Sequence, residues 1–81
     1  MSDPTIEFAK QGHTEKNTKE ILLLVYDALK EKNYNPTAQI VGYILSEDPT
    51  YITTHNNARN LIRKIDRDDL LIMLVNNYLQ K

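Results

Sequence analysis

The fold of this chain is decided by residues 34–64, which read YNPTAQIVGYILSEDPTYITTHNNARNLIRK. Asn35-Pro36 places a capping residue before a proline, whose fixed φ and missing N–H suit the first position of a helix. Asp48-Pro49 repeats this pattern and predicts a short helical turn through Ile52. The stretch therefore predicts two helices joined by a connection that starts with its own helical turn.

The first of these helices is predicted from Pro36 to about Ser46. It carries two adjacent apolar rows at helical spacing, with Ala38, Val41 and Leu45 in one and Ile40 and Ile44 in the other. Gly42 in its interior costs about 1 kcal/mol relative to alanine. We interpret this glycine as a site of close approach by another helix, the alternative being a weak point without such a role.

The second helix is predicted from about Asn56 to Ile65, with Thr53 or Thr54 as the cap. Its apolar face consists of Ala58, Leu61, Ile62 and Ile65. The opposite face carries Arg59, Asn60, Arg63 and Lys64.

Two flanking segments are also predicted to be helical. Asn17 with Glu20 forms a capping box for a helix that ends near Asn33, a residue that tolerates a left-handed cap. Asp66 caps a last helix, with Asp68 and Asp69 in its first turn, where the helix dipole favours negative charge. This last helix has a broad apolar surface made of Leu70, Leu71, Met73, Leu74, Val75, Tyr78 and Leu79.

No strand pattern competes with these signals. We therefore expect an all-α bundle of four main helices plus a short helical turn, with a centre that resembles a helix-turn-helix. Residues 1–16 lack periodicity and predict a flexible N-terminal arm, although Ile6 and Phe8 could instead lie extended on the domain. Residues 17–81 form the predicted helical domain.

The composition excludes several classes of protein. The 81 residues are enough for one domain, carry a net charge of −1, and contain no cysteine and only two histidines. No apolar run approaches a membrane span or a signal peptide, which favours the cytoplasm. We expect no cofactor. The chain has too few histidine and cysteine residues to favour a metal site built from them.

Candidate chemical sites have simpler structural explanations. The acidic group at Asp66, Asp68 and Asp69 lacks the glycine and the glutamate of a calcium loop, and helix capping explains it better. His55 has no serine or cysteine nucleophile at a suitable spacing, which favours a cap or a buried hydrogen bond. No glycine-rich phosphate loop is present. The sequence therefore predicts no catalytic, cofactor or metal site.

Four basic residues form a possible partner-binding face, namely Arg59, Arg63, Lys64 and Arg67. A recognition helix that reads DNA bases would use such residues. However, the connection from Ser46 to Thr53 is longer than a helix-turn-helix turn, and four cations in a chain of net charge −1 are few. We favour a solvated face or a site for an acidic partner over a nucleic-acid site.

Residues 34–70 resemble the signature of the IreB family, small cytoplasmic regulatory phosphoproteins of Gram-positive bacteria. The matching positions are Asn35-Pro36, Gln39 to Tyr43, Leu45-Ser46, Asp48-Pro49, Tyr51-Ile52, His55-Asn56, Ala58 to Asn60, Ile62 to Lys64 and Arg67-Asp68. The segment from Thr5 to Phe8 is similar to the N-terminal Thr-x-x-Phe of the family. The chain departs from the family at Asn33 and Glu47, where glycine is usual. If Glu47 adopts a positive φ, the expected cost is roughly 1 kcal/mol.

This resemblance implies a homodimer without enzymatic activity. It implies phosphorylation of Thr5 by a transmembrane Ser/Thr kinase with extracellular PASTA domains, with Ser2 as a weaker acceptor, and reversal by a phosphatase. It also implies negative regulation of cell-wall stress responses, including cephalosporin resistance, through a downstream protein that the sequence does not identify.

The apolar surfaces of residues 17–33 and 66–79 are wider than one helix packed on a small monomer requires. The excess favours a partner subunit, the alternative being that a leucine is simply exposed. We predict an interface that contains Leu22, Leu24, Tyr26, Leu71, Val75 and Tyr78.

Overall fold

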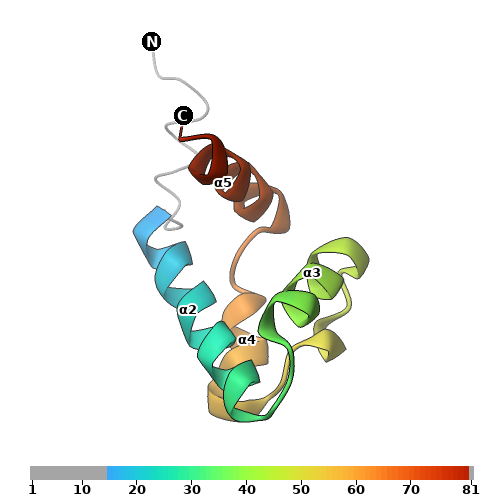
Figure 1. The fold of residues 1–81 in the computed structure, drawn as a ribbon. Coiled ribbons are helices and arrows are strands. Elements are labelled where there is room, and N and C mark those ends of the chain that lie inside the picture. The colour runs from blue at the N-terminus through green and yellow to red at the C-terminus, as the bar shows by residue number, and fades with distance from the viewer. Residues whose placement is uncertain (1–14, 81) are drawn as a thin grey trace.

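Four α-helices and two short 3₁₀-helices make up the regular structure of the computed structural model, which describes residues 15–80 (Figure 1). The α-helices are α2 (Glu15–Glu31), α3 (Pro36–Ser46), α4 (Ala58–Ile62) and α5 (Arg67–Leu79). The 3₁₀-helices η1 (Pro49–Tyr51) and η2 (His55–Asn57) lie between α3 and α4. The all-α prediction is therefore confirmed. Of the predicted arm, residues 1–14 lie outside the described part of the chain.

The start of α2 differs from the prediction. This helix begins at Glu15, so Asn17 lies inside it and the predicted cap at that position is wrong. Glutamate and lysine are good helix formers, and the helix includes these two residues before the asparagine. At the other end the prediction holds, because Asn33 has a φ of 68° and Tyr34 N–H donates to the Leu29 carbonyl at 3.0 Å.

Three side chains cap helices as predicted. Asn35 Oδ1 accepts the Ala38 N–H at 3.1 Å and thereby starts α3. Asp48 Oδ1 accepts the Thr50 N–H at 3.0 Å at the start of η1. Asp66 Oδ1 accepts the backbone N–H groups of the two aspartates that follow in α5, at 2.8 and 3.4 Å. Each cap pairs donors that the first turn of a helix leaves without partners.

The helix α4 is shorter than the predicted segment from Asn56 to Ile65. Asn56 and Asn57 both adopt left-handed conformations, with φ values of 53° and 63°, so the α-helix begins only at Ala58. Asparagine tolerates this conformation better than most residues, which explains why the interruption falls there. Before this interruption, Thr53 Oγ1 accepts the His55 N–H at 3.2 Å.

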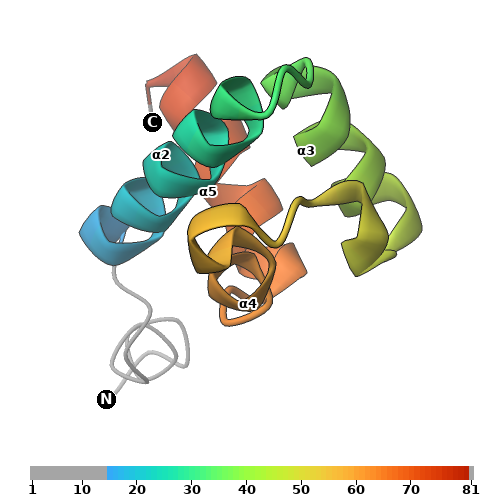
Figure 2. The same ribbon diagram turned by 90° about the horizontal axis from the view of Figure 1, so that it is seen from below.

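The core lies where α2 packs against α3 and α4 (Figure 2). One group of buried side chains joins α2, the connection and α4, and consists of Val25, Ala28, Leu29, Ile52, Ala58 and Ile62. A second, smaller group consists of Ile44, Ile65 and Leu70. Four half-buried side chains pack against both groups, namely Ile21, Leu22, Ile40 and Tyr43. The two groups therefore form one continuous core.

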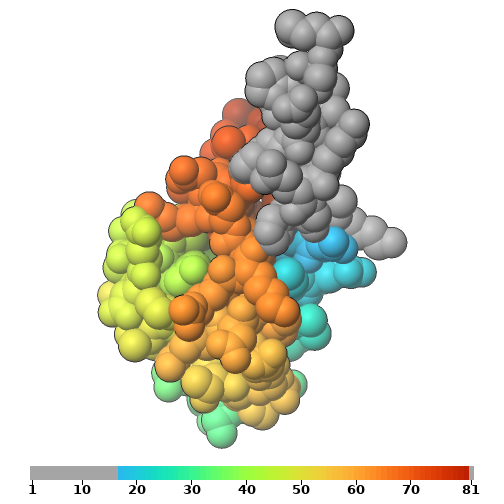
Figure 3. All heavy atoms as spheres, turned by 180° about the vertical axis from the view of Figure 1, so that it is seen from behind, coloured from blue at the N-terminus to red at the C-terminus, as the bar shows by residue number. Residues whose placement is uncertain are grey.

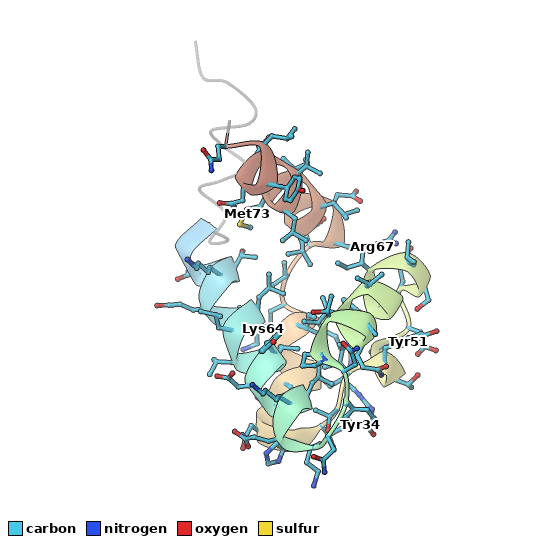
Figure 4. The ribbon with its side chains drawn as sticks, in the orientation of Figure 1. Tyr34, Tyr51, Lys64, Arg67 and Met73 are labelled. Atoms are coloured by element: carbon cyan, nitrogen blue, oxygen red, sulfur yellow. The ribbon has the colours of Figure 1, made fainter. Side chains whose placement is uncertain are left out.

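Gly42 permits a close contact, but the neighbour differs from the predicted one. A Cβ at this position would lie 2.5 Å from Cε1 of Tyr51, so the glycine accommodates the Tyr51 ring rather than a second α-helix. Figure 4 shows Tyr51 beside α3. The Gln39 Nε2–H donates to the Tyr51 carbonyl at 2.9 Å and fixes η1 against the same helix.

The effect of replacing Gly42 by alanine on the free energy of unfolding is expected to have opposite signs in the presence and in the absence of the Tyr51 ring. In the otherwise unchanged chain, Gly42→Ala should destabilise by roughly 1–2 kcal/mol, because overpacking against the ring outweighs the gain in helix propensity. In a Tyr51→Ala background the same change should stabilise by about 1 kcal/mol. Urea unfolding at one protein concentration checks this cycle, and equal effects in both backgrounds would contradict the contact.

A second prediction concerns Asp48, whose pKa is lowered mainly by the Thr50 hydroxyl, which donates to Oδ1 at 2.7 Å, and further by the Thr50 backbone N–H. A carboxyl group with a lowered pKa stabilises the folded state above its unfolded pKa, and this contribution is lost as the pH falls through the folded pKa. Thr50→Val should raise the pKa of Asp48 and move that loss to higher pH. NMR titration of the carboxyl carbon measures this shift, with Thr54→Val as a control.

Candidate interaction surfaces

More large apolar side chains are exposed than buried in this structure. Within residues 17–80, nine apolar side chains are buried, whereas thirteen large ones are exposed. Scattered exposed leucines are common on soluble proteins, but a contiguous group of them marks an interaction site. The position of these thirteen residues therefore decides where a partner would bind.

The apolar groove is a hollow of about 370 Å³ where α2, α3 and α5 meet. Its lining consists of Lys19, Leu22, Leu23, Tyr26, Thr37, Ile40, Val41, Ile44 and Leu74. Apart from the polar ends of Lys19, Tyr26 and Thr37, these side chains offer only apolar atoms. Such a groove fits the apolar face of a helix rather than a charged or strongly polar ligand.

The helix α5 supplies most of the remaining exposed apolar surface. Only Leu70 of this helix is buried, and the exposed set comprises Leu71, Ile72, Leu74, Val75, Tyr78 and Leu79. Tyr78 is 89% exposed, which is the largest fraction in that set. Figure 3 shows α5 rising above the rest of the described chain. A helix with this much uncovered apolar surface is typical of a subunit that lacks its partner.

The predicted interface residues lie in three places, namely the groove, the exposed face of α5 and a separate side of α2. Leu22 and Tyr26 line the groove, and Leu71, Val75 and Tyr78 lie exposed on α5. Leu24 is 55% exposed but does not line the groove.

Helical spacing explains why Leu24 is separate. It shares its side of α2 with the exposed acids at i−4, i+3 and i+7, which are Glu20, Asp27 and Glu31. Leu23, which the sequence analysis did not select, lies in the groove and is 53% exposed. Its one-turn spacing from Lys19 and Tyr26 is the signal that could have identified it.

The four basic residues do not form one free surface. Arg59 Nε–H donates to the Ile52 carbonyl at 2.8 Å, so this side chain stabilises the connection before α4. Arg67 Nη1–H donates to the Ile44 carbonyl at 2.7 Å, and its Nη2–H donates to the Glu47 carboxylate. Of the predicted face, only Arg63 and Lys64 are exposed, and no described residue forms an ion pair with them.

The helix that was considered as a DNA recognition helix, α4, is poorly suited to that role. A recognition helix enters the major groove with several residues free to contact bases. Here α4 has five residues, and Arg59 within it is committed to a backbone carbonyl. The geometry therefore disfavours the nucleic-acid alternative.

His55 has a structural partner. Its Nε2 lies 2.7 Å from Glu31 Oε1, which links η2 to the end of α2, and its side chain is about one-third exposed. The hydrogen-bonding role predicted for this residue is confirmed, although the side chain is only half-buried. Among the described residues, the hydrogen bond of this ring goes to Glu31 and not to a serine or cysteine.

The acidic residues at the start of α5 act through the Asp66 cap already described. Within residues 15–80, no group of three or more histidine, cysteine, aspartate or glutamate side chains is placed to hold a metal ion. In the same part of the chain, no helix combines the length and apolar character that crossing a bilayer requires.

Nearly the whole chain matches the model of a known protein family. The model of a family described as IreB regulatory phosphoprotein matches residues 3–80. The matched span covers every helix described above, the apolar groove and Thr5, whereas Ser2 lies one residue before it.

Proposed function

Because this chain belongs to the IreB family of regulatory phosphoproteins, we propose that it is a non-enzymatic regulator that works through binding and is switched by phosphorylation of Thr5. The family match, which includes this threonine, carries the proposal. The kinase is a transmembrane Ser/Thr kinase with extracellular PASTA domains, and a phosphatase reverses its action. The output is negative regulation of cell-wall stress responses, including cephalosporin resistance, in the cytoplasm.

The acceptor assignment rests on the segment before the described residues. Thr5 lies inside the matched span, and the segment from Thr5 to Phe8 resembles the N-terminal Thr-x-x-Phe of the family, which favours Thr5 over Ser2. Residues 1–12 carry Asp3, Glu7 and Lys10, a net charge of −1 when the terminal amine is ignored. A phosphate adds about −1.5 to −2 near neutral pH, so the modified segment is strongly acidic.

The added negative charge can act in two ways. The phosphate could dock on the basic residues, or it could repel an acidic partner that the unmodified segment tolerates. Because the guanidinium groups of Arg59 and Arg67 already hold backbone carbonyls, docking would depend on two exposed cations, Arg63 and Lys64. Exposed ion pairs contribute little and must offset the entropy of ordering the segment. The structure thus supports repulsion as the mechanism.

The regulator acts as a homodimer in this proposal. The apolar face of α5 carries Leu71, Val75 and Tyr78 at spacings of three and four residues, which is the pattern of a helix that binds in a groove. The groove lies on the same chain, so two copies related by a twofold axis can exchange these contacts and close the assembly. Each large side chain buried in this way contributes roughly 1.5–3 kcal/mol.

Two neighbouring leucines provide a matched test of the interface. Leu23→Asp should weaken dimerisation by at least about tenfold, because it places a charge in the groove. Leu24→Asp introduces the same charge at an equally exposed leucine on the other side of α2 and should change dimerisation by less than about twofold. Sedimentation equilibrium over a concentration series measures both. A monomeric wild-type chain at tens of micromolar would refute the dimer, and equal effects of the two variants would refute this interface.

The switch is tested by Thr5→Ala. This variant should lose most of the phosphate that the kinase adds, while its thermal stability and dimerisation stay nearly unchanged. Mass spectrometry and phosphate-sensitive gels on the kinase-treated protein measure the loss, and Ser2→Ala serves as the control. Full phosphorylation of the Thr5→Ala variant at Ser2, Thr14 or a threonine of the helical domain would refute the assignment.

A further inference from the structure

Arg67 joins the start of α5 to the end of α3. It is the first residue of α5, and its guanidinium extends back to the end of α3 (Figure 4). There Nη1–H donates to the Ile44 carbonyl at 2.7 Å, and Nη2–H donates to the carboxylate of Glu47. The side chain is 31% exposed, so these contacts are partly shielded from water.

The acceptor at Ile44 belongs to a helix end that needs donors. The last four carbonyls of a helix have no partner within it, and the helix dipole favours a cation at that end. In α3 the Tyr43 carbonyl accepts the Glu47 N–H, and the next carbonyl accepts Arg67. Glu47 itself is left-handed, with a φ of 60°, and this conformation turns the chain so that its carboxylate meets the same guanidinium.

The rest of α5 has few anchors. Leu70 is its only buried residue, and Ile65 is buried just before the helix begins. These two side chains and Arg67 all lie within six residues, while the part of the helix after Leu74 is exposed. The contacts of the first turn therefore contribute strongly to the direction in which α5 leaves the body, together with Leu74, which lines the apolar groove.

We propose that Arg67 is a positioning residue for self-association, which holds α5 at the angle that presents its apolar face to a second copy. This inference rests on the proposed homodimer and adds the element that orients it. The two bonds of Arg67 restrain rotation of α5 about the buried group of Ile44, Ile65 and Leu70. Without them the helix remains folded, because the Asp66 cap persists, but its apolar face loses a fixed direction. Association must then also order the helix, which lowers affinity.

The test compares Arg67→Gln with Arg63→Gln. Both variants remove one positive charge, but Arg63 is exposed and has no ion-pair partner among the described residues. Arg67→Gln should raise the dimer dissociation constant by roughly tenfold or more, the effect of losing a hydrogen bond made by a charged group, whereas Arg63→Gln should change it by less than about twofold. Arg67→Lys retains the charge without the planar fork and should give an intermediate value.

Hydrogen exchange distinguishes positioning from general stability. At a temperature where all variants are folded, Arg67→Gln should increase exchange of α5 amides while the amides of α2 stay protected. Glu47→Gln, which retains the bond to Ile44, should have a smaller effect on both measurements. If the Arg67→Gln variant is dimeric and both its dissociation constant and the hydrogen exchange of its α5 amides are unchanged, the positioning role is overturned but the homodimer is not. A wild-type chain that is monomeric would overturn the homodimer on which it rests.

Discussion

The burial of Ile52 between α2 and α4 is the contact on which the arrangement of the helices depends. Its side chain is fully buried with Val25 and Leu29, and its carbonyl accepts the Arg59 side chain. The connection around it contains two 3₁₀-helices of three residues each, which are too short to hold their own position. Ile52 fixes this connection from the inside, so that α4 can pack beside α2 and the apolar groove can form.

The features that could be predicted from the sequence are local. The caps at Asn35, Asp48 and Asp66 were identified because the cap residue and the donors that it accepts lie within three residues of each other. The left-handed conformation at Asn33 was predicted because a helix ends there, and that at Glu47 was considered because glycine is usual at this position in the family. Helix caps and helix ends depend on residues that are close in the sequence, so a short stretch of sequence is enough to predict them.

The features that could not be predicted depend on contacts between distant residues. Nothing near Arg67 in the sequence shows that its donors bond the carbonyl of Ile44, 23 residues earlier. The ring that covers Gly42 comes from the 3₁₀-helix after α3, and α-helical periodicity does not describe such a segment. The consecutive left-handed asparagines before α4 also break the period, which is why this helix begins later than predicted. That Leu23 rather than Leu24 lines the groove could not be read from the sequence, because the position of α3 relative to α2 was unknown.

The pairing of α2 with α4 also sets an order of events while the protein is made. The apolar face of α2 is synthesised first, but its buried partners Ile52 and Ile62 follow more than twenty residues later. A nascent α2 therefore emerges from the ribosome with its leucines uncovered, and an apolar helix in that state is a target for chaperones and for aggregation. Because Leu70 of α5 belongs to the same continuous core, the core closes only when α4 and the first turn of α5 have both left the ribosome.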